Sequence, residues 1–317
     1  MRSAIVLAAG KGTRMKSSLN KVMHPVSNKP MIGHIVSSLR KAGVENIVVV
    51  VGHGAESVKE YLGDSVQYAL QEPQLGTGHA VMQAQCLKDL DGDTLILCGD
   101  GPCIQSETIE QAFAANENSE MTVLTALLPD GERYGRIVRN SKGDVEKIVE
   151  AKDCTPQQLE IKEINTGIFC FKNKLLFENL QEIGNDNAQN EYYLTDLVEI
   201  FNRKQLRVRA AVVSDPQETM GVNDRVDLAK AQKWMTRHEC ERHMRNGVTI
   251  VDPDTTYIDV GVQIGQDTVI YPNVMIQGDT VIGSNVTIYS NSFLRNAVIG
   301  DAAVIDSSKI VESSVGA

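Results

Sequence analysis

The chain has 317 residues, more than a single hydrophobic core usually organises, so about two domains are expected. It carries 31 Lys and Arg against 41 Asp and Glu, a formal net charge of −10, which disfavours nucleic acids and anionic membranes as partners. No apolar run reaches the ~18 residues of a transmembrane helix, and the short apolar stretch after Met1 runs into a glycine-rich turn. That stretch favours a strand over a signal peptide, so we expect a cytoplasmic protein.

Roughly the first 220 residues alternate short β-rich runs with helical patterns, which is typical of an α/β fold with right-handed crossovers. Strands are predicted over 4–7, 46–51, 94–98 and 121–127, and helices over 31–42, 55–62, 78–86 and 107–116. The uninterrupted apolar run 47–51 fits a sheet that is covered on both faces. An open, largely parallel sheet of this kind binds ligands at the carboxyl ends of its strands.

The pattern changes near residue 225, where a single connecting helix is predicted over 225–246. An aliphatic residue then recurs every six positions from Ile258 to Leu294 and, after a five-residue step, at Ile299, Ile305 and Val311. A hexapeptide period with Asn, Asp and Gly between the aliphatic residues is typical of a parallel β-helix. The predicted domains are therefore 1–224, a linker helix 225–247 and a partial β-helix 248–317.

No helix or polar cap follows the last aliphatic position of this repeat, Val311. The terminal coil of a solenoid exposes unpaired strand edges unless something covers it. We therefore expect either that the sequence is a piece of a longer protein or that another segment or subunit covers this coil.

The first predicted strand leads into a glycine-rich turn, Leu7-Ala8-Ala9-Gly10-Lys11-Gly12-Thr13-Arg14-Met15. A Walker A loop is excluded because Thr13 follows Gly12, and a dinucleotide fingerprint is excluded because Met15 stands at the third glycine position. Such a turn can still bring backbone N–H groups up to phosphates, with Lys11 and Arg14 adding positive charge. A plain glycine turn with solvated basic residues remains the alternative at this point.

Further motifs follow in order along the chain. They are Lys21-Val22, Gln71-Glu72-Pro73-Gln74-Leu75-Gly76-Thr77-Gly78-His79-Ala80, Gly99-Asp100, Tyr134-Gly135-Arg136-Ile137, Glu150-Ala151-Lys152-Asp153, Asn165-Thr166-Gly167, Asn187-Ala188-Gln189, Glu191-Tyr192-Tyr193-Leu194-Thr195-Asp196 and Gly221-Val222-Asn223. With the turn and the hexapeptide pattern, they resemble the bacterial bifunctional N-acetylglucosamine-1-phosphate uridyltransferases/glucosamine-1-phosphate acetyltransferases, over essentially the whole chain. The resemblance implies a Rossmann-like nucleotidyltransferase domain with a mixed, mostly parallel sheet, then a linker helix and a truncated left-handed parallel β-helix.

The resemblance also implies roles for individual residues, carried over motif by motif. The catalytic residues it implies are Arg14, Lys21 and Asp100. The nucleotide-binding residues it implies are Leu7, Ala8, Ala9, Gly10, Gln71, Gly76, Thr77 and Gly99. The sugar-binding residues it implies are Gly135, Glu150, Asn165 and Thr166. The magnesium ligands it implies are Asp100 and Asn223.

The reaction that the resemblance implies is uridylyl transfer from UTP to N-acetylglucosamine 1-phosphate, with release of pyrophosphate, in peptidoglycan synthesis. A sugar phosphate is already ionised at neutral pH, so charge neutralisation and in-line positioning should dominate over general-base catalysis. Asp100 offers the hard oxygen ligand that Mg²⁺ prefers. A carboxylate such as Glu150 can hold sugar hydroxyls, and an amide such as Asn165 can hold an acetamido group.

In the family, the acetyltransferase site lies between subunits of a trimer, in later coils than those before Ala317. No acetyltransferase residue is therefore carried over, and acetyl transfer is not expected from this chain. A homotrimer through the β-helix is the assembly that the resemblance implies, and no nucleic-acid or membrane partner is expected.

Two other functions stay open from the sequence, namely a nucleotidyltransferase for a different sugar phosphate and a non-catalytic scaffold. The sequence also departs from the family pattern near the proposed site. Gly101 and Cys103 stand where aliphatic residues are usual, Asn20 where proline is common, and Asn190 where glycine is common. The backbone freedom of Gly101 is expected to loosen the neighbouring Asp100.

Overall fold

The computed structural model of the chain describes residues 1–131, 133–187 and 189–316 and separates into two compact units. The first unit comprises Met1–His24 and Pro30–Asp224, and the second comprises Pro25–Lys29 and Arg225–Ala317. Ala188, which belongs to one of the motifs, and Ala317, at which the predicted β-helix domain ends, lie outside the described residues. Within the described ranges, no helix combines the length and the apolar character needed to cross a membrane.

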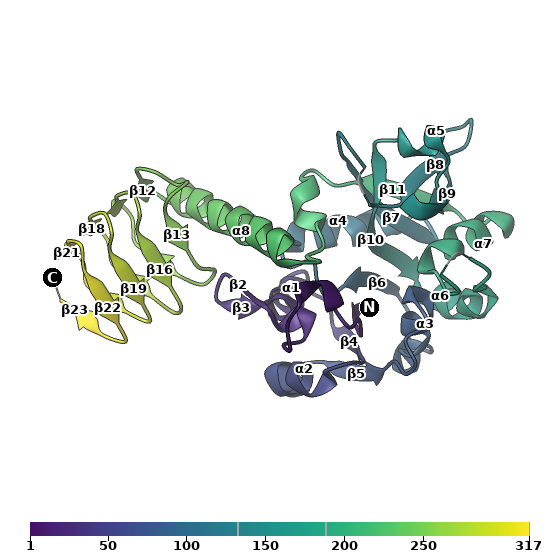
Figure 1. Cartoon of the computed structure of the whole chain (residues 1–317), viewed down its shortest axis with the longest axis horizontal. Coiled ribbons are helices and arrows are strands. Elements are labelled where there is room, and N and C mark those ends of the chain that lie inside the picture. Colours follow the sequence, from purple (N-terminus) through teal and green to yellow (C-terminus); the bar gives the residue numbers. More distant parts are fainter. Residues whose placement is uncertain (132, 188, 317) are drawn as a thin grey trace. The chain divides into compact units, whose positions relative to one another are not determined.

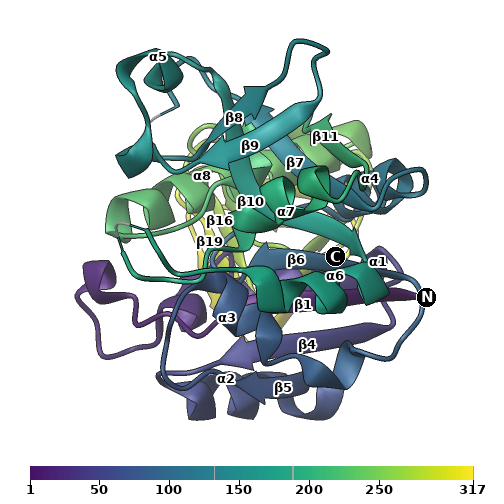
Figure 2. The same ribbon diagram turned by 90° about the vertical axis from the view of Figure 1, so that its right-hand side faces the viewer.

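A nine-stranded sheet forms the first unit, with the main path β11-β7-β10-β6-β1-β4-β5; β8 pairs with β10, and β9 with β8 (Figure 1, Figure 2). Its strands are β1 (Arg2–Ala8), β4 (Asn46–Val51), β5 (Gln67–Leu70), β6 (Asp93–Cys98), β7 (Met121–Leu127), β8 (Arg136–Arg139), β9 (Val145–Val149), β10 (Glu163–Lys172) and β11 (Val208–Val212). Parallel pairs join β1 to β4 and β6, β4 to β5, and β7 to β11, whereas β10 runs antiparallel to β6, β7 and β8. The predicted α/β class with a mixed sheet is confirmed.

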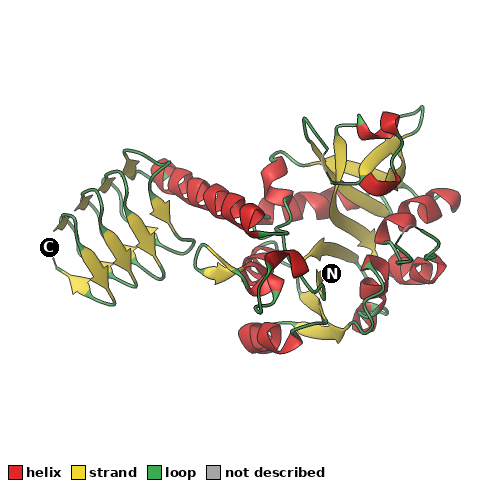
Figure 3. Ribbon diagram, in the orientation of Figure 1, coloured by secondary structure: helices red, strands yellow, loops and turns green. Residues whose placement is uncertain are grey.

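Helices connect and cover these strands (Figure 3). They are α1 (Met31–Lys41), α2 (Ala55–Leu62), α3 (Thr77–Met82), α4 (Ser106–Asn116), α5 (Pro156–Leu159), α6 (Asn173–Asn179) and α7 (Leu197–Arg203). The helix predicted over 78–86 ends early, at Met82. The N–H groups of Gln83 and Ala84 donate to carbonyls only three residues back, and a 3-10 turn follows over Gln85–Leu87. The tighter hydrogen-bond pattern closes the α-helix before the predicted end.

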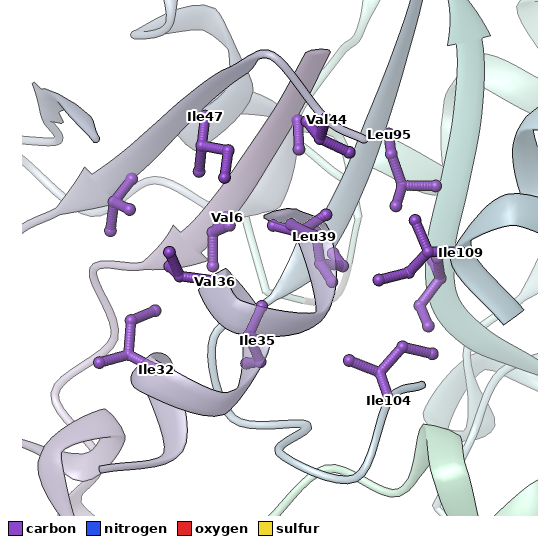
Figure 4. Packing of buried hydrophobic residues seen from close by; sticks show 14 of the residues in the cluster. Val6, Ile32, Ile35, Val36, Leu39, Val44, Ile47, Leu95, Ile104 and Ile109 are labelled. Atoms are coloured by element: carbon purple, nitrogen blue, oxygen red, sulfur yellow. The ribbon is translucent and has the colours of Figure 1, made fainter. Parts of the chain in front are cut away.

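Two hydrophobic clusters lie on opposite faces of the sheet, because successive strand residues point to opposite sides. Val6 of β1 belongs to one cluster and its neighbour Ile5 to the other. Figure 4 shows the first cluster, where strand residues meet α1 and α4. Its labelled members are Val6, Ile32, Ile35, Val36, Leu39, Val44, Ile47, Leu95, Ile104 and Ile109. Coverage on both faces explains why strand residues 47–51 are apolar throughout.

The second unit contains most of the short hairpin β2 (Pro25–Val26) and β3 (Lys29–Pro30), the helix α8 (Arg225–Arg245) and the hexapeptide coils. The coil strands are β12 (Thr249–Ile250), β13 (Tyr257–Ile258), β14 (Gln263–Ile264), β15 (Val269–Ile270), β16 (Met275–Gln277), β17 (Val281–Ile282), β18 (Thr287–Ile288), β19 (Phe293–Arg295), β20 (Val298–Ile299), β21 (Val304–Ile305), β22 (Lys309–Val311) and β23 (Ser314–Val315). They stack into three parallel four-stranded sheets, β12-β15-β18-β21, β13-β16-β19-β22 and β14-β17-β20-β23. The predicted parallel β-helix is confirmed.

The register of the coils departs from the prediction at one position. The buried Leu294 pairs with Ile310, whereas Val311 pairs with the exposed Arg295. Ile310 therefore packs against the solenoid core, although the hexapeptide count picks out its neighbour Val311 as the aliphatic position of this coil. The step from Ile305 to the next inward residue has five positions instead of six.

Candidate active site

A cavity of about 330 Å³ opens at the carboxyl ends of β1 and β6 in the first unit. Most residues that the resemblance assigns to the nucleotide and its phosphates line this cavity, which we call the nucleotide cavity. These residues are Leu7, Ala8, Ala9, Gly10, Lys21, Gln71, Gly76, Thr77 and Asp100. They come from segments far apart in the chain, which parallel pairing of β1 with β4 and β6 brings to one edge of the sheet.

Hydrogen bonds and one glycine hold the turn after β1 in shape. Gly12 has a φ of 59°, and a Cβ atom there would lie 2.5 Å from the Cβ of Lys21, so this position requires glycine. Asn20 accepts a hydrogen bond from the N–H of Val22 at 3.2 Å and donates one to the carbonyl of His53 at 2.8 Å. The amide at position 20 thus supplies two contacts that a proline could not make, and it fixes the backbone beside Lys21.

Two pairs of a cationic side chain and an oxygen acceptor lie at the end of β6. The Lys21 ammonium forms an ion pair with Asp100 Oδ2, and the two side chains are 15% and 19% exposed. Arg14 Nη2 donates to Asn223 Oδ1 at 2.7 Å, although neither residue lines the nucleotide cavity. The N–H of Val222 donates to the Asp100 carbonyl at 2.9 Å, which holds the segment around Asn223 against the end of β6.

Asp100 and Asn223 fit a magnesium ion by their chemistry. A carboxylate and an amide oxygen are hard donors, and Mg²⁺ usually binds through one or two such groups while keeping water and phosphate ligands. In this structure each of the two acceptors is paired with a cationic side chain, so a Mg²⁺ ion bound there would take over these contacts and leave Lys21 and Arg14 to other anionic groups. Among the described residues, no group of three or more His, Cys, Asp and Glu side chains is arranged to hold a metal.

Gly99 lies outside the lining of the nucleotide cavity. Its N–H donates to the carbonyl of Leu7 at 2.8 Å. A Cβ atom at this position would lie 3.1 Å from that oxygen and 3.2 Å from the Cβ of Ala8. The absence of a side chain at Gly99 thus lets the ends of β1 and β6 approach closely, which is a contribution to the shape of the site.

A second cavity of about 230 Å³, which we call the sugar cavity, shares Leu7, Thr77 and Cys98 with the first. All four residues that the resemblance assigns to the sugar line it, namely Gly135, Glu150, Asn165 and Thr166. Gly135 directly precedes β8, Glu150 directly follows β9, and the other two lie in β10. The antiparallel pairing of β10 with β8, and of β8 with β9, brings them together.

An irregularity in β10 shapes one wall of the sugar cavity. The register with β7 shifts between Asn165 and Ile168, and Gly167 has a φ of 78°. Asn165 Oδ1 accepts the N–H of Gly167 at 3.0 Å, so the oxygen of this side chain is used within the strand. The Thr166 hydroxyl donates to the carbonyl of Leu124 at 2.7 Å. The Asn165 side-chain amide thus has N–H groups to offer a carbonyl in the cavity.

Two further carboxylates lie near Glu150, the one carboxylate among the residues that line the sugar cavity. Burial raises the pKa of Glu150, and the nearby charges of Asp153 and Asp196 raise it further. Burial, with a contribution from Glu199, raises the pKa of Asp196 to about 6. An ionised Glu150 would accept hydrogen bonds from sugar hydroxyls, and these would offset the cost of its burial.

Cys98, the last residue of β6, is a lining residue that the sequence motifs did not predict. It lines the nucleotide cavity, the sugar cavity and a third cavity of about 140 Å³. Burial and the charge of Asp100 raise the pKa of its thiol to about 12, so it is neutral at physiological pH. Its place at a strand end immediately before Gly99-Asp100 was the available signal. Other missed lining residues are Gln74, Glu191, Tyr134 and Thr195.

Two of the four departures from the family pattern have local explanations, namely Asn20, through the hydrogen bonds given above, and Asn190. Asn190 has a φ of 53°, in the left-handed region that glycine favours and asparagine tolerates. A Cβ atom at Gly101 would meet nothing nearer than the Met220 carbonyl at 3.9 Å, so neither space nor backbone requires glycine there. Nothing in the structure explains Cys103, which is buried.

Together, the cavities at the strand ends and the hexapeptide coils define the class as a nucleotidyltransferase joined to a hexapeptide-repeat solenoid. The family model of nucleotidyl transferases matches residues 3–217, and that of the bacterial transferase hexapeptide (six repeats) matches residues 261–296. A bifunctional protein GlmU from Latilactobacillus sakei is 51% identical over 99% of this chain and 68% of that protein. A bifunctional protein GlmU from Geobacillus thermodenitrificans is 51% identical over 99% of this chain and 69% of that protein. One from Listeria monocytogenes serotype 4a is 49% identical over 99% of this chain and 70% of that protein.

The chain belongs to the family of bifunctional GlmU proteins. The sequence-based identification is confirmed, and with it the enzyme class of N-acetylglucosamine-1-phosphate uridyltransferase. A solved structure described as a glucose-1-phosphate thymidylyltransferase from Bacillus anthracis in complex with sucrose matches with a TM-score of 0.59. It is 22% identical and covers 73% of this chain and 94% of its own, and it supports the fold alone.

Proposed function

We propose that the chain transfers a uridylyl group from UTP to N-acetylglucosamine 1-phosphate by a magnesium-dependent in-line displacement at the α-phosphate. The observation that carries the proposal is the pairing of Lys21 with Asp100 and of Arg14 with Asn223. This arrangement keeps cationic side chains and magnesium-type oxygen donors together beside a cavity suited to a nucleotide. Family membership supports the choice of substrates.

In this proposal, the backbone of Leu7, Ala8, Ala9 and Gly10 holds the nucleotide. Arg14 supplies a forked guanidinium and Lys21 a mobile ammonium for the phosphates. A Mg²⁺ ion held by Asp100 and Asn223 would supply Lewis-acid stabilisation of the negative charge that develops on transfer. Glu150 and Asn165 bind the sugar hydroxyls and the acetamido group, and so they hold the sugar phosphate at the adjoining cavity.

The chain needs no general base or covalent nucleophile for this reaction. The attacking oxygen belongs to a phosphate that is already ionised at neutral pH. The only cysteine that lines the cavities in the described part of the chain, Cys98, has a protonated thiol. Rate acceleration therefore comes from positioning and from charge stabilisation.

The test is pyrophosphate release from UTP and N-acetylglucosamine 1-phosphate, with magnesium and then with EDTA. We expect metal-dependent turnover that falls by roughly 10²–10³-fold or more in Asp100→Ala, since a charge-stabilising group is lost. The control is Asp91→Ala, which removes an exposed carboxylate paired with Lys174. Turnover with glucose 1-phosphate alone would overturn the sugar assignment, and no turnover with any sugar phosphate would favour a scaffold.

We further propose a cytoplasmic homotrimer that associates through the hexapeptide coils, for which the family match supplies the support. Light scattering on the purified chain tests the trimer. We propose no acetyltransferase activity for these 317 residues, because every role carried over from the family serves uridylyl transfer. Thiol release from acetyl-coenzyme A with glucosamine 1-phosphate tests this statement, and any turnover that depends on glucosamine 1-phosphate would refute it.

A further inference from the structure

The amide nitrogen of the Gln71 side chain makes its contacts inside the protein. Gln71 is 5% exposed and lines the nucleotide cavity. Its Nε2 donates to the carbonyl of Gly76 at 2.9 Å and lies 3.2 Å from Nδ1 of His79. Both hydrogens of the amide nitrogen therefore have acceptors within the protein, one a carbonyl and the other a ring nitrogen.

The opposite orientation of this carboxamide is unfavourable. Turning the amide over would bring its oxygen up to the Gly76 carbonyl, where two acceptors would oppose each other. The oxygen Oε1 makes no hydrogen bond to the described residues, and it is not among the buried side-chain atoms that lack a partner. It is therefore the acceptor that Gln71 presents to the nucleotide cavity.

His79 supports this orientation only if Nδ1 carries the lone pair. A neutral imidazole has a single such nitrogen, and an amide nitrogen of Gln83 lies 3.2 Å from the opposite ring nitrogen, Nε2. Gln83 is less buried than Gln71, so its whole carboxamide can rotate away from the ring, at the cost of its 2.9 Å bond to the His79 carbonyl. Gln71, which is nearly enclosed, cannot, and the Nδ1 lone pair goes to it.

We propose that His79 is a positioning residue for base selection. By accepting from Gln71 Nε2, it holds Oε1 toward the base as an acceptor. Uracil carries an N–H donor at N3, whereas cytosine has a lone pair there, so the oxygen favours uridine over cytidine nucleotides. This inference rests on the proposed function for the identity of the cavity's ligand, and it adds the residue that sets the orientation of the reading group.

The experiment compares UTP with CTP in the wild type, His79→Leu and His79→Asn. Leucine removes the ring acceptor, whereas the Asn side chain can place an oxygen near the position of Nδ1. We expect the ratio of kcat/KM for UTP to that for CTP to fall about tenfold in His79→Leu, which is the effect of one lost hydrogen bond. We expect KM for UTP to rise while kcat at saturation changes less than about twofold, because His79 touches no reacting group. Asn should restore most of the ratio.

Gln83→Leu is the matched control, because it removes the amide on the other side of the same ring. We expect it to retain the ratio within about twofold. An equal loss of selectivity in Gln83→Leu and His79→Leu, or no recovery in His79→Asn, would mean that the ring acts by packing and would overturn the proposal. An unchanged ratio in His79→Leu would overturn it as well.

Calorimetric binding of UTP and CTP to the same variants separates this inference from the proposed function. Preferential UTP binding that weakens in His79→Leu supports the role of His79 even if N-acetylglucosamine 1-phosphate is not the acceptor. Equal binding of UTP and CTP by the wild type would refute the role of His79 even if uridylyl transfer occurs.

Discussion

Replacing Gly76 by alanine should both destabilise the first unit and weaken nucleotide binding. Gly76 has φ 105° and ψ 177°, a backbone region that is nearly restricted to glycine. A Cβ atom there would lie 2.7 Å from the carbonyl oxygen and 2.9 Å from the amide nitrogen of Tyr192, so backbone must move. The backbone region costs about 1–3 kcal/mol, and forcing an extra methyl group into packed surroundings costs about 1–3 kcal/mol. We therefore expect the free energy of unfolding to fall by roughly 2–6 kcal/mol.

The same displacement reaches Gln71, the residue that is proposed to read the base. The Gly76 carbonyl accepts from Gln71, and the N–H of Gly78 donates to the carbonyl of Tyr192 at 2.7 Å. KM for UTP should therefore rise in Gly76→Ala, measured by pyrophosphate release, while urea unfolding reports the stability. Gly184→Ala is the control, since its Cβ would meet no atom within 4 Å and its φ is not positive. A loss below about 0.5 kcal/mol in Gly76→Ala, with unchanged KM, would refute the steric argument.

Three further predictions concern Glu150, which lines the sugar cavity, its neighbour Asp196, and Gly101. The raised pKa of Glu150 means that it takes up a proton at higher pH than an ordinary glutamate, so KM for the sugar phosphate should rise on acidification more steeply than in Glu150→Gln. Substrate titration is common to both proteins, and parallel profiles would contradict this role. The pKa of Asp196 is raised to about 6 in the folded protein. The ionisation of Asp196 therefore lowers the free energy of unfolding as the pH rises from the lower pKa of the unfolded chain to about 6. After allowance for screening at this partly exposed group, Asp196→Asn should stabilise by about 1 kcal/mol at pH ~8 and by almost nothing at pH ~4 in urea unfolding; equal effects would refute it. Gly101→Ala should stabilise by about 0.4–1 kcal/mol in the same assay, because its site accepts a methyl group, and a loss would disprove that.

Local sequence patterns predicted most of the fold. The runs 46–51 and 121–127 match β4 and β7, because continuous apolar β-rich segments have few alternatives in a covered sheet. The hexapeptide period similarly predicted the coils, since each coil repeats the same local geometry. The errors lie where tertiary packing sets a boundary. The period could not show whether Ile310 or its apolar neighbour Val311 faces inward, because only pairing with Leu294 decides between them.

Local sequence patterns predicted less of the candidate site than of the fold. Arg14 and Asn223 are 209 residues apart and meet only through the folded path of the chain, so motif resemblance was the sole route to naming both. The contact of His79 with Gln71 depends on the turn between β5 and α3, whose path no periodicity encodes. Gly99 has a structural role that its motif does not show, because the lack of a side chain there lets the ends of β1 and β6 approach closely.

The strand directions explain why the two cavities adjoin. β6 runs parallel to β1 and antiparallel to β10, so the carboxyl end of β6 lies beside the amino-terminal part of β10. The parallel strands contribute residues to this edge from their carboxyl ends, as β1 does with Leu7. The antiparallel strand β10 contributes residues from its amino-terminal part, as it does with Asn165. Cys98 stands at the border of the two arrangements and lines both cavities. A group transferred between ligands in the two cavities would therefore pass near the end of β6, where Asp100 follows Cys98 by two residues and pairs with Lys21.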